Sequence, residues 1–231
     1  YWLERGTQSS RPSLIVNPSS GRLPTLTPKG RMLRREDAAA RNRVATGPQD
    51  RNLYERCVSR ALPGAMMPGF YNHNYQILQT PGYVVILLEM IHDVRVIPLD
   101  GRPHVPTQIG QWMGDSRGRW EGETLVVETT NFAAQSDFTG GGFANLKANY
   151  RGSGSTLRLT ERFTRLDDGT IDYEFTANDP TIWTTPWTAS IPMRKVDPPE
   201  PLYEYACHEG NYGIVGILTG HRAEEQRAAQ P

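Results

Sequence analysis

The sequence predicts an all-β protein, in which an antiparallel meander closes into a barrel or, as the alternative, folds into a β-sandwich. From Tyr75 onward, apolar and polar residues alternate with a period of two. Short turns containing Gly, Pro or Asp separate the alternating runs, and no long helical pattern interrupts them. A meander leaves two unpaired edges, which closure into a barrel or packing of two sheets protects.

Residues 1–70 are expected to form a long irregular arm that wraps the body. Within the arm, the apolar run Leu14–Val16 predicts a short strand closed by an Asn-Pro-Ser-Ser-Gly turn. The alanine-rich run 31–45 predicts a helix that ends before Gly47. The charges of this run cover most of the circumference, which is typical of a surface helix.

Residues 71–231 are expected to form the barrel as a single folding unit. The segment 202–209 is interpreted as its last strand, and 221–229 as a short terminal helix. The other strands are expected, in order, at 75–80, 83–90, 94–100, 118–120, 124–132, 156–166, 170–179 and 181–193, with a glycine-rich loop at 138–155.

Charge is balanced over the whole chain, with 25 Lys/Arg and 25 Asp/Glu, but not along it. Residues 1–60 carry 12 Lys/Arg against 5 Asp/Glu, and residues 61–231 carry 13 against 20. A basic arm beside an acidic body is expected to lie on that body or on a second subunit, so a homo-oligomer formed through the arm is one of two alternatives. The balance argues against a nucleic-acid partner, and no apolar run is long enough for membrane insertion.

The chain has two cysteines, Cys57 and Cys207. In a cytosolic protein they would be two buried thiols, and in an exported protein one disulfide. The long arm and the many Trp, Tyr, Asn, Gly and Thr residues favour the disulfide, which would contribute about 5 kcal/mol in the chain-entropy model. No charged-then-apolar leader begins at Tyr1, so we expect a mature or trimmed soluble chain from the periplasm or the cell exterior.

Two carboxylates interrupt apolar rows of the expected strands. Glu161 stands between Leu159 and Phe163, and Glu89 shares the face of Leu87. A buried carboxylate is costly unless it is paired or protonated. One interpretation is therefore a buried Glu–Arg pair, and the other is a general acid or base that faces a cavity. The arginines considered as partners are Arg95, Arg102 and Arg162.

The histidines lack the spacing of a preformed metal site. No HExxH or HxH pattern and no short Cys/His cluster occurs, so we predict no cofactor and no structural zinc site. A divalent metal held from separate strands stays open, with His92, His104, His208 and a glutamate as ligands. Taken singly, each histidine is more simply explained by a hydrogen-bonded structural role than by catalysis.

The stretch "YEYACHEGNY" concentrates ionisable side chains near the C-terminus. On a strand, Tyr205 and Cys207 share one face and His208 the other, so the adjacent cysteine and histidine cannot form a nucleophile–base pair. His208 and Tyr212 are candidate proton-transfer groups if their face lines the barrel mouth. "GDSRG" matches G-x-S-x-G, but no helix follows, and Ser116 is interpreted as a turn residue.

Aromatic residues are more numerous than the turns require. Most are expected in the core, and in an exported barrel some line a pocket that stacks against flat organic ligands or sugar rings. The candidates for substrate binding are Tyr75, Trp112, Trp183, Tyr205 and Tyr212.

The phrases "IPLDGRPH", "GDSRGRWEG" and "YEYACHEGNY" resemble those of a family of exported proteins from soil and environmental bacteria. The resemblance extends over most of the chain, including "SLIVNPSSGRLP" in the arm. It implies export and transfers no activity. The expected barrel resembles that of the lipocalin superfamily, with short peripheral helices.

Two functions fit these residues. The first is an exported enzyme that acts on a small carbohydrate-like or aromatic molecule by acid–base chemistry, with lyase or isomerase activity favoured over hydrolysis because no primed nucleophile is present. The second is a non-catalytic, lipocalin-like protein that binds a small molecule or haem, which an apolar interior with only a neutralised Glu–Arg pair would favour. In the enzyme, the acid or base would be Glu89 or Glu161, the proton shuttles His92, His104 and His208, and the stabilisers of negative charge Arg95 and Arg102.

Overall fold

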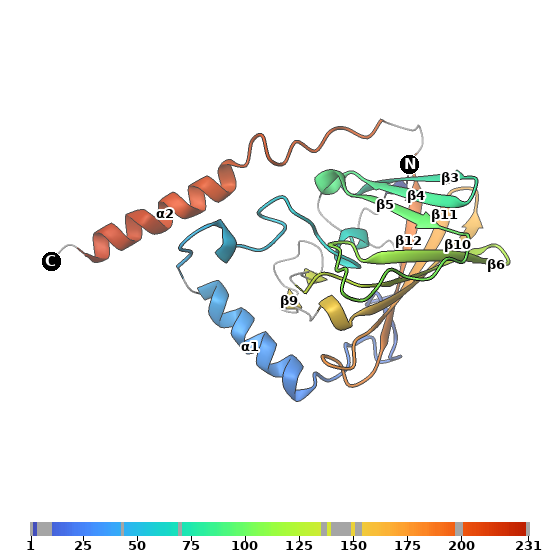
Figure 1. Cartoon of the computed structure of the whole chain (residues 1–231), viewed down its shortest axis with the longest axis horizontal. Coiled ribbons are helices and arrows are strands. Elements are labelled where there is room, and N and C mark those ends of the chain that lie inside the picture. The colour runs from blue at the N-terminus through green and yellow to red at the C-terminus, as the bar shows by residue number, and fades with distance from the viewer. Residues whose placement is uncertain are drawn as a thin grey trace.

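Antiparallel β-strands form most of the regular structure, as the sequence predicts, and two α-helices lie at the periphery (Figure 1). The computed structural model describes residues 2–3, 11–42, 44–68, 71–134, 138–139, 149–150, 154–196 and 201–229. Most of the predicted glycine-rich loop lies outside these residues. Within them, no helix is long and apolar enough to cross a membrane. The helices are α1 (Pro28–Asn42), α2 (Tyr212–Ala228) and the 3-10 turns Pro48–Asp50, Gly64–Met66, Met90–His92 and Gly154–Thr156.

One sheet joins strands from the whole chain in the order β5-β4-β3-β1-β12-β11-β10-β7-β6, with β2 paired to β12. β1 is two residues long and connects a part of three strands, β3 to β5, to a part of six. A separate small sheet pairs β8 with β9. The strands are β1 (Trp2–Leu3), β2 (Ile15–Asn17), β3 (Asn74–Thr80), β4 (Tyr83–Leu88), β5 (Val94–Pro98), β6 (Asp115–Glu121), β7 (Thr124–Thr130), β8 (Phe138–Thr139), β9 (Asn149–Tyr150), β10 (Arg158–Asp167), β11 (Thr170–Asn178) and β12 (Trp187–Lys195).

The sheet curls until its two edge strands, β5 and β6, come together (Figure 1). No ladder of hydrogen bonds joins these edges in the described part of the chain, so the predicted closed barrel is not found. Side chains make the contact instead. Gly118 on β6 leaves room for it, because a Cβ at this position would lie 2.7 Å from Leu99 Cδ2 and 2.8 Å from Ile97 Cγ2.

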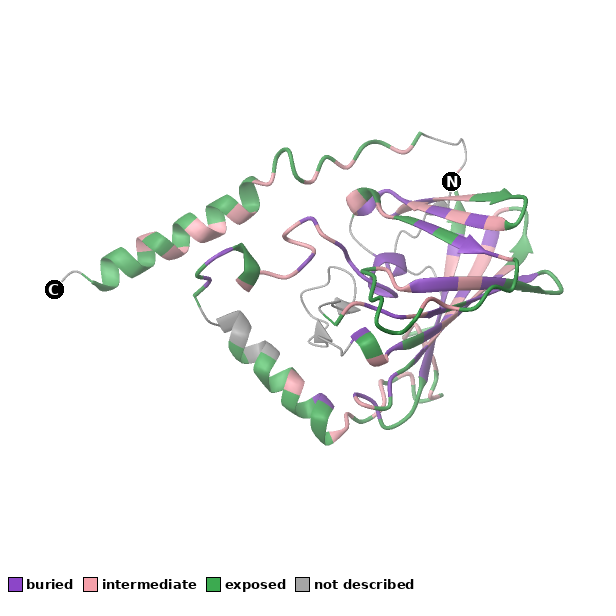
Figure 2. Cartoon of the chain, in the orientation of Figure 1, coloured by how far each residue is buried: buried purple, intermediate pink, exposed green. Residues whose placement is uncertain are grey.

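The core lies inside the curl, and the alternation of each strand defines it. On β10 the inward row is Leu159, Glu161 and Phe163, as predicted, and the side chain of Glu161 is fully buried. Tyr173 and Phe175 face them from β11. Figure 2 shows the buried residues on the sheet and in the loop before β3, whereas α2 is exposed.

On β4 the predicted inward row is wrong. The buried residues are Val84, Ile86 and Leu88, and Leu87 is only partly buried. Both faces of this strand are apolar, so alternation alone cannot identify the inward face. β4 also ends one residue before Glu89, which lies in the following turn rather than in a core row.

The arm supplies strands to the sheet. β1 pairs with β3 and β12, and β2, which corresponds to the predicted strand Leu14–Val16, pairs with β12. α1 begins three residues before the predicted helix because Thr27 caps it: its Oγ1 accepts a hydrogen bond from Gly30 N (3.0 Å). Gly30 lies so close to Ile182 that a Cβ would be 2.5 Å from the Ile182 carbonyl oxygen. A homo-oligomer formed through the arm stays a prediction.

The C-terminal segment differs most from the prediction. Residues 201–211 are irregular and form no strand, but the predicted disulfide between Cys57 and Cys207 is present. α2 begins at Tyr212 rather than at residue 221, because Asn211 Oδ1 accepts from Ile214 N (3.2 Å) and so caps the helix. The disulfide therefore fastens the segment that leads into α2 to the arm.

Candidate functional site

An ion pair occupies the centre of the curled sheet. Arg95 Nη1 donates to Glu161 Oε1 (2.9 Å), Arg95 Nη2 donates to Oε2, and the Tyr173 hydroxyl also donates to Oε1 (2.8 Å). Burial lowers the pKa of Arg95, but the Glu161 carboxylate more than offsets this and raises it above its ordinary value. The arrangement is the buried Glu–Arg pair considered above, and the Glu161 carboxylate faces its partners rather than a hollow.

The two other arginines considered as partners lie on the surface. Arg102 Nε donates to Asp100 Oδ2 (2.8 Å), and Arg102 Nη2 donates to the Tyr83 hydroxyl (3.1 Å). The Arg102 hydrogen bonds lower the pKa of Asp100 to about 2. Arg162 Nη1 donates to Glu121 Oε2 (2.9 Å). Neither arginine pairs with Glu161.

A hollow of about 890 Å³ opens at one end of the curled sheet, where the β3–β4, β6–β7 and β10–β11 turns meet. We call it the mouth hollow. Its buried lining consists of the core residues Val84, Ile86, Leu125 and Phe163. Its exposed rim includes Trp120, Glu123, Arg165, Asp168 and Lys195. None of the residues selected from the sequence as catalytic or substrate-binding lines it.

An aromatic pair separates the mouth hollow from the ion pair. The Phe163 ring lines the hollow and packs on the Tyr173 ring, with centroids 4.8 Å apart. Tyr173 in turn binds Glu161 through its hydroxyl. Burial and the nearby Glu161 carboxylate raise the pKa of Tyr173 well above its ordinary value, so the hydroxyl stays protonated. The hollow thus has an apolar floor.

A smaller hollow of about 340 Å³ lies at the opposite end of the β3–β4 hairpin, and two predicted catalytic residues, Glu89 and His92, line it. Asn74 Nδ2 donates to Glu89 Oε2 (2.6 Å), and the backbone N–H of Tyr205 donates to His92 Nε2 (2.6 Å). The backbone of His92 is left-handed (φ 59°), which is unusual for a residue other than glycine. The structure therefore brings Glu89, His92 and Tyr205 together.

A cluster of phenols around Arg60 and His73 lies beside this smaller hollow. Arg60 Nη1 and His73 Nε2 are 2.6 Å apart, and the hydroxyls of Tyr54 and Tyr71 are 3.3 Å apart. Burial, together with the charge of Arg60, lowers the pKa of His73 to about 4. His73 is therefore neutral at pH 7 and accepts the hydrogen bond from Arg60. Tyr75, a predicted substrate-binding residue, is buried, and its hydroxyl donates to Ala65 O (3.2 Å).

His104 pairs with a carboxylate that the sequence did not single out. Its Nδ1 lies 2.8 Å from Asp115 Oδ2, which also accepts from Val105 N (3.1 Å). Arg117 Nη1 donates to Asp115 Oδ1 (2.7 Å). Burial raises the pKa of Asp115, but these hydrogen bonds lower it below its ordinary value. Ser116, expected in a turn, is instead buried in β6.

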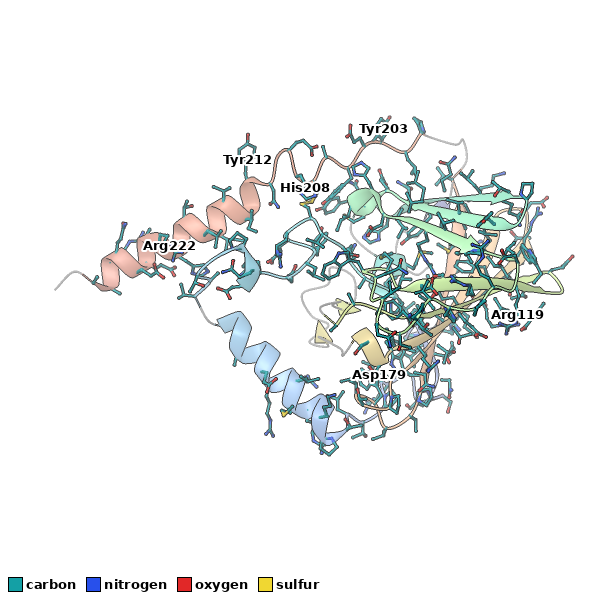
Figure 3. All side chains as sticks on the ribbon, viewed as in Figure 1. Arg119, Asp179, Tyr203, His208, Tyr212 and Arg222 are labelled. Carbon is teal, nitrogen blue, oxygen red and sulfur yellow. A yellow bond between two sulfur atoms is a disulfide. The ribbon has the colours of Figure 1, made fainter. Side chains whose placement is uncertain are left out.

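The remaining predicted residues lie apart from these groups. His208, on the segment that leads into α2, and Tyr212, the first residue of α2, are exposed and lie away from the sheet (Figure 3). Trp112 is also exposed, whereas Trp183 is buried against Trp187. His92, His104 and His208 do not form the metal site that the sequence left open: no group of three metal-ligating side chains occurs within the described residues.

The predicted site residues omit three that the structure makes prominent, and of these only Asp115 carries a signal in the sequence. Asp115 and Arg117 are two residues apart, so on a strand their side chains lie on one face, where they form an ion pair. Arg60 lies three residues after Cys57, and the disulfide fixes both beside the C-terminal segment. Trp120, at the end of β6, lies on the rim of the mouth hollow because the β6–β7 turn reaches it.

Comparisons of the chain with family models, with curated proteins and with solved structures find no match, so the resemblance to a family of exported proteins stays a prediction.

Proposed function

We propose that the protein binds a small, flat, largely apolar organic molecule in the mouth hollow and that it works in an oxidising compartment outside the cytosol. The observation that carries the proposal is the hollow itself, whose floor is the core face of the sheet. Ligand sites in proteins typically measure about 300–1,000 Å³ and combine an apolar lining with a few polar groups. The disulfide fits an oxidising compartment.

The composition of the lining indicates the class of ligand. Trp120 is 47% exposed at the rim, and its indole offers a face on which an aromatic or sugar ring can stack. The floor of Val84, Ile86 and Phe163 favours apolar carbon over a hydrated polar group. Haem is a poor fit, because the described lining contains no His, Cys, Met or Tyr to bind its iron.

The interior favours binding over catalysis. Glu161 and Arg95 neutralise each other, and Phe163 and Tyr173 lie between this pair and the hollow. The rim carboxylate of Asp167 accepts a hydrogen bond from Gly169 N (2.8 Å), and bonds to residues 169 and 170 lower its pKa. Asp167 is therefore ionised at pH 7, and it stabilises the turn rather than donating a proton.

The proposal is tested by titrating the whole chain with N-phenyl-1-naphthylamine and following energy transfer from tryptophan. We expect saturable binding that Ile77→Trp weakens at least tenfold, because Ile77 lines the hollow and a larger ring would fill it. Val96→Trp is the matched control, since Val96 is exposed on β5 and lies outside the hollow. Equal affinities of the two variants, or no saturable binding by the wild type, would refute the proposal.

Acid–base catalysis on a small carbohydrate-like or aromatic molecule is the second candidate. It is favoured by Glu89 and His92, which line the smaller hollow together. The Tyr205 N–H occupies His92 Nε2, which leaves Nδ1 as the proton donor of the neutral ring. Oligomers of uronic acids, whose lyase products absorb ultraviolet light, are the substrates to screen. Turnover lost in Glu89→Gln and kept in Glu204→Gln, on the same hollow, supports catalysis; turnover unchanged in Glu89→Gln contradicts it.

A further inference from the structure

Arg60 is a buried cation without a buried anion. Arg60 is 4% exposed, and it lies in the part of the arm that precedes β3. Nη1 bonds to the neutral His73 ring, and the guanidinium lies 4.9 Å from the centroid of the Tyr54 ring. Nε is buried and has no hydrogen-bond partner, and no carboxylate among the described residues forms an ion pair with it. An isolated buried charge is costly, so a missing partner is a meaningful observation.

Two other arginines show what Arg60 lacks. Arg95, the other buried arginine of the described chain, has Glu161 as its counter-ion. Arg51, nine residues before Arg60, presents its Nε and Nη2 to the carboxylate of Glu55 at 2.8 and 2.9 Å. This two-pronged geometry is the usual way in which a guanidinium recognises a carboxylate or a phosphate. The same edge of Arg60 receives no partner from the described residues.

Phenol groups from two distant segments surround this cation. Tyr54 and Tyr71 come from the loop before β3, and Tyr205 comes from the C-terminal segment. The Tyr54 and Tyr71 hydroxyls lie 3.3 Å apart, and their hydrogen bond is the main cause that lowers the pKa of Tyr71. Burial, together with Tyr71 and Tyr54, raises the pKa of Tyr205. All three act electrostatically on Arg60. Protonated phenols are hydrogen-bond donors, so the cluster offers an oxyanion one guanidinium and several hydroxyls.

Covalent and backbone constraints hold the cluster in place. The disulfide links Cys57, three residues before Arg60, to Cys207, two residues after Tyr205. Cys57, Ala61 and Asn72 all have left-handed backbones, with φ of 59°, 50° and 54°. Such conformations are costly outside glycine and persist where the surrounding structure fixes them. The groups around Arg60 are therefore preorganised, which lowers the entropic cost of binding.

We propose that Arg60, Tyr54, Tyr71 and Tyr205 form a binding site for an oxyanion, either free phosphate or a carboxylate, which sits on the Nε and Nη2 edge of the Arg60 guanidinium. Tyr71 is 55% exposed, so in this proposal the anion enters from the side of Tyr71. The site is at the opposite end of the β3–β4 hairpin from the mouth hollow and does not depend on the function proposed for it.

Thermal unfolding of the whole chain tests the site, with sodium phosphate, sodium acetate and sodium chloride compared at equal ionic strength and pH 7. We expect phosphate or acetate to raise the melting temperature saturably relative to chloride. The shift should vanish in Arg60→Gln and persist in Arg51→Gln, whose guanidinium edge Glu55 already fills. The anion that acts distinguishes a phosphate from a carboxylate site.

A second variant decides the matter if Arg60→Gln does not fold. Tyr71→Phe removes one exposed hydroxyl and keeps the ring, and we expect it to raise the half-saturating anion concentration about tenfold, as loss of a hydrogen bond to a charged group does. The proposal is overturned if neither anion gives a saturable shift in the wild type, if Arg60→Gln retains the shift, or if Tyr71→Phe leaves the half-saturating concentration unchanged.

Discussion

The Arg95–Glu161 pair can be tested as a structural element by a double-mutant cycle. Glu161→Gln keeps the shape of the side chain and an acceptor for the Tyr173 hydroxyl, but it removes the charge that offsets Arg95. Because both side chains are at most 1% exposed, Arg95 cannot turn to water. Leaving a buried charge unpaired costs about 3–5 kcal/mol, so Glu161→Gln should lower the free energy of unfolding by that amount.

Removing both charges should cost less than removing one. Replacing a buried pair with apolar residues of similar volume is often neutral, so Arg95→Met in the Glu161→Gln background should recover about 2 kcal/mol or more. Urea unfolding at pH 7, followed by circular dichroism, gives the free energies of unfolding of the wild type, the single variants Glu161→Gln and Arg95→Met, and the double variant. A loss below 1 kcal/mol in Glu161→Gln would refute the reasoning, and so would a double variant less stable than the single one.

Three other expectations can be measured by the same unfolding assay. Burial raises the pKa of Asp93 to about 6 from its ordinary 3.8, so the contribution of Asp93 to the free energy of unfolding is fully present below pH 4 and is lost as the pH rises through 6. Asp93→Asn should therefore be up to about 3 kcal/mol more stable than the wild type at pH 7.5 and no more stable at pH 4. An equal gain at both pH values would contradict this. Replacing Cys57 and Cys207 with serine should cost about 2–5 kcal/mol, because the bond spans 150 residues, and an unchanged midpoint would show that the loop is constrained without it. Gly118→Ala should cost about 1–3 kcal/mol by clashing with Ile97 at the β5–β6 contact, and no loss would mean that these edges do not meet.

The sequence predicts the sheet and the inward glutamate well, because strong local patterns encode both. The run around Glu161 alternates polar and apolar residues without interruption, so a single charged residue in the apolar row identifies the interior face. The Asp167-Asp168-Gly169 turn between β10 and β11 carries its own signal as well. Cys57 and Cys207 lie far apart along the chain, but their pairing was predicted because the composition favoured an oxidising compartment.

Other features depend on contacts that a sequence does not display. The segment around Tyr205 alternates like a strand, but a strand needs a partner, and the bonds of this segment go to His92 and to the disulfide instead. α2 begins earlier than expected because the Asn211 cap lies outside its charged half. Whether a curled sheet closes depends on how its edges meet, and here side chains around Gly118 contact without ladder bonds.

The candidate sites were predicted only in part, for the same reason. Glu89, His92 and Tyr205 gather as candidate residues, but His104, His208 and Tyr212 lie elsewhere. Arg60 carries no pattern that sets it apart from the other basic residues of the arm. Only its burial and its lack of a carboxylate partner in the described chain distinguish it, and both arise from tertiary structure.

The central claim is that the mouth hollow is a ligand site, and amide chemical shifts of the ¹⁵N-labelled protein test it most directly. On titration with N-phenyl-1-naphthylamine, we expect the largest shift changes at the three turns that surround the hollow, 79–84, 120–125 and 165–171. Changes concentrated at 201–212 and 54–75 instead, or no changes at saturating ligand, would contradict the claim.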